Sequence, residues 1–307
     1  MGLVSSRELL VPARAGGYAV GAFNTSNLEI SQAIFAAAAE KRAPVIVATS
    51  ETAIKYAGYV NVYSMVKHLS EYYRVPAALH LDHGGDVSLV VKCIRHGWTS
   101  VMIDASKEDY DQNVAVTAKV VEIAHMAGVP VEAELGRLRG VEDAVNVEER
   151  DSFLTDPDQA ADFVKQTGCD SLAVAVGTSH GAYKFKGEPK LELGRLSEIA
   201  QKVSLPLVLH GASSVPQDVL EKASKYGAKL PGAKGVPDAT LKEAIKMGIS
   251  KINIDTDLRL GFTAGVRQVL AESPEVFDPR KIVGLGRHAI TEVVKNKIEV
   301  FGSAGKA

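Results

Sequence analysis

Eight short apolar, β-branched runs recur along this chain, and each is followed by a longer amphipathic stretch. The runs are YAVGAF (18–23), PVIVAT (44–49), PAALHL (76–81), SVMI (100–103), VPVEAEL (129–135), SLAVAV (171–176), LPLVLH (205–210) and SKINI (250–254). Nearly continuous apolar runs predict parallel strands buried on both faces, and the stretches between them have the apolar spacing of helices. Such alternation forms either a closed barrel or an open doubly wound sheet. Eight units favour a (β/α)8 TIM barrel.

One barrel of this type accounts for the whole length, so we expect a single catalytic domain over residues 1–307. Residues 137–157 are charged and poor in large apolar side chains, which predicts a long active-site loop after the fifth strand. Glycines and prolines within 222–248 interrupt the seventh helical stretch, which predicts a loop and a separate helix. The tail carries one more helical pattern at about 286–299, an extra C-terminal helix.

The composition is that of an ordinary globular protein, with 46% hydrophobic and 23% charged residues. A formal net charge of −2, without a long Lys/Arg run, argues against nucleic acid or an anionic membrane as a partner. Cys93 and Cys169 lie outside disulfide or metal-knuckle spacings, so we expect reduced thiols. The N-terminal residues lack a secretory pattern, and no apolar stretch reaches the roughly 18 residues of a membrane span. We therefore expect a cytoplasmic protein.

Three histidines follow or end predicted strands, each beside a glycine: His83 in DHGG, His180 in SHGAY and His210 in LHGAS. In a barrel the carboxyl ends of the strands meet at one face, where the chemistry lies. Three neutral imidazoles with an open fourth position are a common catalytic metal site. Taken singly, each histidine is more often a structural one. Together at strand ends, they favour a divalent-metal site.

Carboxylates accompany these histidines. Asp82 immediately precedes His83, which is a suitable place for a general base, although it could instead orient the neighbouring imidazole. Glu132 and Glu134 are two apart on a strand and therefore face the same way, into the barrel mouth. Glu134 is a candidate fourth ligand or metal-site carboxylate. Glu132, deeper in the strand, and Asp104, after the fourth strand, are candidate supporting or secondary metal groups.

Phosphate binding is indicated by the turns after the last strands. Barrels often bind phosphate there, with backbone N–H groups and a helix N-terminus. This chain has HGASS (210–214) and NIDTD (253–257), with Gly181 and Lys184 from the sixth unit beside them. Each turn alone is weak, and their convergence favours a phosphorylated substrate.

The blocks LHLDHG, VEAELGRLRGVED, GTSHGAY, LVLHGAS and KINIDTD, in this order, resemble the class II fructose-bisphosphate aldolases and the related tagatose-bisphosphate aldolases. The resemblance runs from AFNTSN to the DPR at 278–280. It implies a zinc- or cobalt-dependent lyase of glycolysis and gluconeogenesis on a (β/α)8 barrel. The implied reaction is reversible cleavage of fructose 1,6-bisphosphate into dihydroxyacetone phosphate and glyceraldehyde 3-phosphate.

The same resemblance assigns roles to residues of this chain. His83, His180 and His210 match the metal ligands, and Glu134 matches an additional ligand. Asp82 matches the residue that handles the proton of the C4 hydroxyl, and Glu142 in GVED matches a mobile acid that exchanges the proton at C3.

Further positions match the substrate pocket of the family. The groups around dihydroxyacetone phosphate, some of them also near a monovalent cation such as Na⁺ or K⁺, match Gly181, Lys184, Gly211, Ser213, Asn253, Asp255 and Thr256. Asn24 and Ser50 match positions that line the pocket. Arg280 resembles an arginine that reaches the other phosphate from a neighbouring subunit, which implies a homo-oligomer, a dimer or a tetramer.

Alternative functions remain at this point. A tagatose 1,6-bisphosphate aldolase would share most of these blocks, although NIDTD favours fructose. A barrel metallohydrolase would place a His-x-His pair after the first strand, where this chain has AFNTSN. A non-catalytic sugar-phosphate binder would not need Asp82 and Glu142 as an acid–base pair.

Overall fold

The computed structural model describes residues 2–137, 139–142, 145–147, 153–180, 191–230 and 233–307. Eight parallel strands close into a barrel in the order β1-β11-β10-β8-β5-β4-β3-β2, which confirms the predicted TIM barrel. The strands are β1 (Val20–Asn24), β2 (Val45–Thr49), β3 (Ala77–Gly84), β4 (Ser100–Ile103), β5 (Val131–Leu135), β8 (Ser171–Val174), β10 (Leu207–Leu209) and β11 (Ile249–Ile254). Closure comes from β1 pairing with β11, with Ala22 opposite Asn253.

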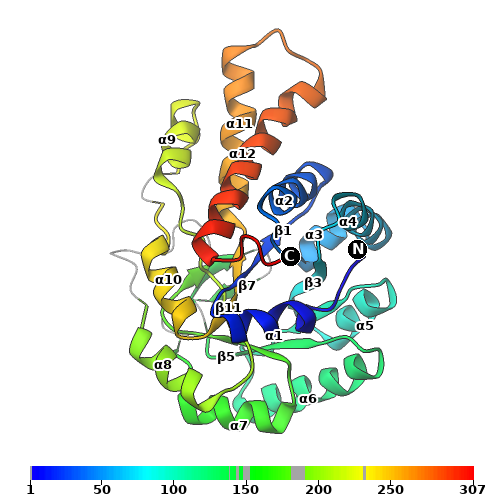
Figure 1. Cartoon of the computed structure of the whole chain (residues 1–307), viewed down its shortest axis with the longest axis vertical. Helices are drawn as coiled ribbons and strands as arrows, with labels where there is room; N and C mark the ends of the chain where they lie inside the picture. The colour runs from blue at the N-terminus through cyan, green and yellow to red at the C-terminus, as the bar shows by residue number, and fades with distance from the viewer. Residues whose placement is uncertain (1, 138, 143–144, 148–152, 181–190, 231–232) are drawn as a thin grey trace.

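Helices surround the barrel, as Figure 1 shows. Several begin at an Asx cap: Asn27, Asp86 and Asp109 each accept a hydrogen bond from the backbone N–H three residues on. The helices between the strands are α2 (Leu28–Lys41), α3 (Glu51–Ala57), α4 (Tyr59–Tyr73), α5 (Val87–Arg95), α6 (Tyr110–Met126), α7 (Pro157–Thr167), α8 (Leu193–Lys202), α9 (Gln217–Lys225) and α10 (Asp238–Lys246). After β11 come α11 (Thr256–Glu272) and α12 (Pro279–Phe301).

The hydrophobic core has two layers because strand side chains alternate between the faces of the sheet. Outward-facing residues such as Leu79 and Leu81 join the large cluster between barrel and helices. Inside the barrel, Met102, Ala173 and Val208 form a small cluster of their own. Apolar residues therefore pack on both faces of most strands, whereas β5 and β11 also carry buried polar and charged side chains, namely Glu132, Glu134, Lys251 and Asn253.

A helix before the first strand, α1 (Ser6–Gly16), was not predicted from the sequence. Ser5 and Glu8 form a capping box at its start. Its buried residues pack against one end of the barrel in a cluster made of Leu9, Leu10, Ala13, Tyr18, Val20, Ala22, Ile46 and Ala78. Since the polar site lies at the carboxyl ends of the strands, α1 covers the opposite end.

Segments outside the repeat differ in part from expectation. The predicted loop over 137–157 contains two short antiparallel strands, β6 (Arg139–Glu142) and β7 (Val145–Val147), and β6 also pairs with β9 (Ser179–His180). The interrupted seventh unit does divide, into α9 and α10. The C-terminal helix α12 begins at Pro279, earlier than predicted, and forms with α11 the hairpin that projects from the barrel in Figure 1.

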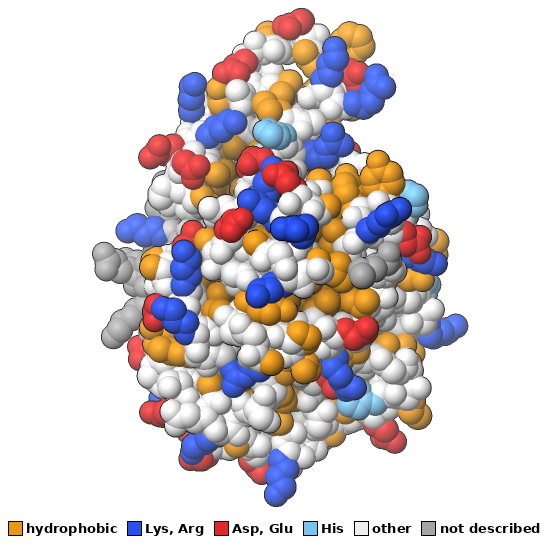
Figure 2. Space-filling view, in the orientation of Figure 1, with side chains coloured by type: hydrophobic (Ala, Val, Ile, Leu, Met, Phe, Trp, Pro, Cys, Tyr) orange, Lys and Arg blue, Asp and Glu red, His pale blue; other side chains and the backbone are white. Residues whose placement is uncertain are grey.

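The surface carries mixed charge. In Figure 2 acidic and basic side chains are interspersed over the visible face, in line with the net charge of −2. Among the described residues, no helix has both the length and the apolar character needed to cross a membrane. Cys93 and Cys169 are free thiols, and burial raises the pKa of each to about 12.

Candidate metal and active site

The end of β3 presents two consecutive residues, Asp82 and His83, to the barrel mouth. Strict alternation would send them to opposite faces. The register of β3 against β4 shifts before Gly84, and His83 has a φ of 48°. Such an irregularity re-aims a side chain at the cost of a strained backbone. Gly84 permits it, because a Cβ there would lie 2.3 Å from the carbonyl oxygen of Met102.

Asp82 is held by two amides. Asn24 Nδ2 on β1 donates to Oδ2 at 2.8 Å, and Asn253 Nδ2 on β11 donates to Oδ1 at 2.8 Å. All three side chains are buried. Since β1 and β11 are neighbours in the closed barrel, barrel closure itself brings the two amides to one carboxylate. The carboxylate therefore has a fixed orientation beside His83.

His83 faces carboxylates as well. Its Nδ1 lies 2.8 Å from Asp104 Oδ2 and 3.7 Å from Glu134 Oε2. Burial opposes a charged His83, but the hydrogen bond that its Nδ1–H donates to Asp104 and the charges of Asp82, Asp104 and Glu134 outweigh burial and raise the pKa of His83 well above the usual value. Burial would raise the pKa of Asp104, yet hydrogen bonds from His83 and Ser106 lower it well below its usual range. The site thus gathers the carboxyl groups of Asp82, Asp104 and Glu134 around His83.

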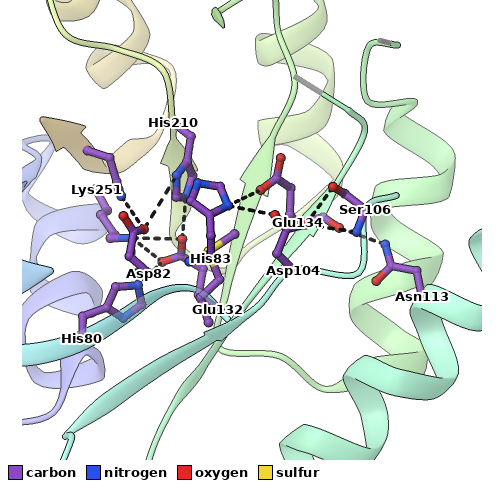
Figure 3. A network of polar contacts seen from close by, with 12 residues as sticks. His80, Asp82, His83, Asp104, Ser106, Asn113, Glu132, Glu134, His210 and Lys251 are labelled. Atoms are coloured by element: carbon purple, nitrogen blue, oxygen red, sulfur yellow. Dashed lines mark hydrogen bonds and ion pairs between the residues drawn. The ribbon is translucent and has the colours of Figure 1, made fainter. Parts of the chain in front are cut away.

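Glu132 lies deeper and is matched by a buried cation. Lys251 Nζ, on β11, donates to its two carboxylate oxygens at 2.9 and 2.7 Å, and His210 Nε2 lies 2.8 Å from Glu132 Oε1. Figure 3 shows the lysine and histidine on this carboxylate. Burial and the charge of Lys251 lower the pKa of His80, whose Nε2 is 3.2 Å from the same ammonium. Glu132 therefore positions His210, and the neighbouring Lys251 ammonium favours the neutral form of His80.

The residues fit a divalent cation. The ring centroids of His83 and His210 are 4.5 Å apart. Within the described residues, the buried Glu134 Oε2 has no hydrogen-bond partner, and burial, with the charge of Asp104 next, raises the pKa of Glu134 well above its usual value. Candidate ligand atoms of Asp82, His83 and His210 lie within 4.8 Å of one another, as do those of His83, Asp104 and Glu134. Imidazole nitrogens with carboxylate oxygens are a donor set that suits zinc.

Other predicted residues fall at the edge of the described structure. The backbone of His180 forms β9 and that of Glu142 forms β6, next to it in the small sheet. The side chains of both lie outside the described part of the chain, as do Gly181 and Lys184 entirely. The sheet nevertheless places the β6 and β9 backbones side by side above the barrel strands from which they come.

The predicted phosphate turns adjoin this site. Gly211, with φ of 61°, follows His210, and a Cβ there would lie 2.7 Å from the carbonyl oxygen of Ser179. Only glycine permits this approach, which brings the β10 turn against β9. Ser213 is buried in the same turn. After β11, Asp255 precedes α11, which begins at Thr256, so that a helix N-terminus follows the strand.

A small pocket at the barrel mouth brings together the expected Asn24, Ser50 and Asp255 with Arg259. Arg259 was missed from the sequence. It lies one helical turn after Asp255 and pairs with that carboxylate at 2.8 Å, a spacing that could have signalled it. Arg280 does not line this pocket. It is 89% exposed in the first turn of α12, at the far end of the α11–α12 hairpin (Figure 1).

The family model described as fructose-bisphosphate aldolase class II matches residues 4–306. The chain belongs to this family. Members of the class II aldolase family are metal-dependent lyases, which agrees with the cluster of histidines and carboxylates at the barrel mouth. The resemblance seen in the sequence blocks is thereby confirmed.

Relatives within the class II aldolase family match the chain over its whole length. It is 54% identical over 305 residues to a fructose-bisphosphate aldolase of Thermus caldophilus, which covers 99% of this chain and 100% of that protein. A fructose-bisphosphate aldolase of Helicobacter pylori is 49% identical, with 99% of each covered. The crystal structure of the YdjI aldolase from Escherichia coli K12 superposes with a TM-score of 0.81 at 33% identity, with 99% of each chain covered.

Proposed function

We propose that this aldolase cleaves fructose 1,6-bisphosphate reversibly into dihydroxyacetone phosphate and glyceraldehyde 3-phosphate. The observation that carries the proposal is the arrangement at β3. Asp82, oriented by Asn24 and Asn253, stands directly beside His83, whose neighbours suit a metal ion. A base and a metal ligand in adjacent positions are what retro-aldol cleavage requires, because a proton leaves one oxygen while negative charge develops on others.

The cation would be held by His83, His180, His210 and Glu134. Glu132 orients His210, and Asp104 orients His83. A bound Zn²⁺ or Co²⁺ supplies Lewis-acid stabilisation of the negative charge that develops on the substrate oxygens. Glu134 Oε2 is buried, has no hydrogen-bond partner among the described residues and lies 3.7 Å from His83 Nδ1, which suits its entry into the ligand set.

Proton handling falls to two carboxylates. Asp82 takes the proton of the C4 hydroxyl, and its two amide partners prevent the carboxylate from turning away. As the C3–C4 bond breaks, its electron pair remains with the dihydroxyacetone phosphate half, and Glu142 returns a proton at C3. The amide oxygens of Asn24 and Asn253 are buried and, as far as the structure describes the chain, lack donors. They are suited to accept hydrogen bonds from sugar hydroxyls.

Phosphate recognition is assigned to the turns after β10 and β11. At such turns, backbone N–H groups and short polar side chains can donate hydrogen bonds to a phosphate dianion. The residues proposed to surround dihydroxyacetone phosphate, together with a Na⁺ or K⁺ ion, are Gly181, Lys184, Gly211, Ser213, Asn253, Asp255 and Thr256. Ser50 and Arg259 line the neighbouring pocket and are candidates for the other phosphate.

Arg280 is proposed to complete that second phosphate site from a neighbouring subunit. Its exposure at the start of α12 supports this, because within one chain it lies away from the pocket. The proposed enzyme is therefore a homo-oligomer, a dimer or a tetramer. We also propose that it acts in the cytoplasm.

The test is a coupled assay with fructose 1,6-bisphosphate and tagatose 1,6-bisphosphate, before and after chelator treatment and after readdition of Zn²⁺ or Co²⁺. We expect kcat/KM at least about tenfold higher for the fructose substrate, since 1.4 kcal/mol of differential binding suffices for this. We also expect activity to vanish with the metal and return on readdition. Preference for tagatose bisphosphate would reassign the substrate, and activity surviving full metal removal would overturn the mechanism.

A further inference from the structure

A buried carboxylate joins the two turns that follow β10 and β11. Asp257 lies in the first turn of α11 and is fully buried. Its Oδ2 accepts a hydrogen bond from the backbone N–H of Ser214 at 3.0 Å, and its Oδ1 accepts one from Val215 at 2.8 Å. One side chain therefore binds two consecutive backbone groups of the other turn, which fixes the distance between α11 and that turn.

A buried lysine on α12 completes the same cluster. Lys297 is fully buried, and its Nζ donates to Ser214 Oγ and to Asp238 Oδ1, the latter at 2.9 Å. Asp257 Oδ2 lies 3.5 Å from the same Nζ. A single ammonium thus connects α12 with α10, α11 and the β10 turn. Burying these charges is costly unless all of them are paired, so the arrangement tolerates few alternatives.

The β10 turn needs an external constraint of this kind. Val215 has a φ of 50°, a conformation that is strained for a β-branched residue. The turn is also tightly enclosed, because a Cβ at Gly235 would lie 2.1 Å from the carbonyl oxygen of Ser213. Strained backbone persists only where its surroundings over-determine it. Asp257 makes the hydrogen bond that holds the N–H of Val215 in this conformation.

We propose that Asp257 and Lys297 are positioning residues for phosphate binding by this aldolase. They hold residues 210–215 against the N-terminus of α11, so that both turns converge on one phosphate group. The inference rests on the proposed function, because that function assigns His210 and Ser213 in this turn to metal and phosphate. Asp257 and Lys297 act through the backbone of the turn. Replacing either residue should therefore weaken phosphate binding more than it lowers kcat.

The variants Asp257→Asn and Lys297→Met test this. Each removes a charge-assisted contact to the turn, so we expect KM for the bisphosphate to rise about tenfold while kcat changes by less than about threefold. The dissociation constant of inorganic phosphate, measured by calorimetry, should rise in parallel, with metal content unchanged. Lys295→Met is the matched control, since Lys295 on the same helix pairs instead with Glu40 and Glu292. It should match the wild type.

Rescue separates positioning from a general loss of packing. A cavity of about 610 Å³, lined by Lys297, Asp238 and Ser214 among others, adjoins the lysine. In Lys297→Ala this space should admit ethylammonium, and the added ethylammonium should return the KM of this variant toward the wild-type value. The KM of Asp257→Asn should not change when ethylammonium is added. Because the residues form one unit, the double variant Asp257→Asn/Lys297→Met should raise KM no more than the stronger single variant. The double variant also leaves no unpaired partner within the Asp257–Lys297 pair and serves if a single variant fails to fold.

Unchanged KM and phosphate affinity in folded variants would overturn the inference. So would a parallel loss of kcat, metal and thermal stability without rescue, because that pattern indicates a merely structural cluster. If the wild type cleaves no ketose bisphosphate, the proposed function fails. Phosphate calorimetry on wild type and variants then still decides whether Asp257 and Lys297 organise an anion site.

Discussion

At the residue scale, the barrel mouth divides its work between neighbours. Asp82 and His83 are adjacent in the chain but have different partners: Asp82 contacts the amides of Asn24 and Asn253, and His83 contacts Asp104. Amide donors orient a carboxylate without neutralising it. A carboxylate that accepts a hydrogen bond from an imidazole instead raises the basicity of the imidazole and so favours metal binding. The partners therefore suit Asp82 to proton transfer and His83 to the metal.

Replacement of these two residues should separate the roles. We expect Asp82→Asn to keep its metal and to lose cleavage by about 10²- to 10⁴-fold, the usual contribution of a general base. His83→Ala should lose the metal together with activity. Metal content measured on the purified variants, alongside single-turnover cleavage, checks both. Loss of metal from Asp82→Asn would show that Asp82 is a ligand, and its assignment as base would then fall.

At the scale of elements, the irregular end of β3 decides where His83 points. The register shift against β4 and the positive φ of His83 occur together, immediately before Gly84. Gly84 allows β3 to approach the Met102 carbonyl so closely that any side chain would clash. Strand β3 is thus more than scaffold, because its local distortion brings a metal-binding group to the mouth.

The glycine pair at this strand end offers a matched experiment. Gly84→Ala places a Cβ 2.3 Å from a backbone oxygen, whereas a Cβ at Gly85 meets nothing within 4 Å. We expect Gly84→Ala to lower the free energy of unfolding by about 1–3 kcal/mol, as overpacking does, and to weaken metal binding because β3 must shift. Gly85→Ala should leave both near wild-type values. Denaturant titration and competitive metal titration measure them, and equal behaviour of the two variants would contradict this account of the bulge.

At the scale of the whole molecule, the site joins strands from all around the barrel. Asp82 and His83 come from β3, Glu134 from β5 and His210 from the end of β10. A cation that these groups bind only when the barrel is closed stabilises the folded state by mass action. Barrel stability and metal loading are therefore linked.

Chelation should accordingly destabilise the protein as well as inactivate it. With free metal at about 1,000 times its dissociation constant, the bound ion contributes about 4 kcal/mol, so the unfolding midpoint should fall when the metal is removed. His83→Ala should show no further fall on chelation. Denaturant unfolding of wild type and variant, with and without chelator, makes the comparison. An equal shift in both would indicate that the metal responsible binds elsewhere.

The amino-acid sequence by itself determined the repeated strand–helix unit and the polar residues at the strand ends. Hydrophobic periodicity is local, and parallel strands in a barrel bring their carboxyl ends together whatever their separation in the chain. Asp82, His83 and His210 could therefore be grouped in advance. Helix α1 was missed because its apolar face has meaning only against the end of the barrel.

Tertiary structure alone decided the contacts that join distant residues. Lys251 neutralises Glu132 across 119 positions, and Lys297 reaches Ser214 across 83. A strand-interior lysine reads as an anomaly in the sequence until a carboxylate from another strand faces it. The turn of His83 out of strict alternation likewise depends on the register of β3 against β4. Side-chain patterns report which face a residue occupies, whereas charge pairing and strain depend on which neighbours the closed barrel supplies.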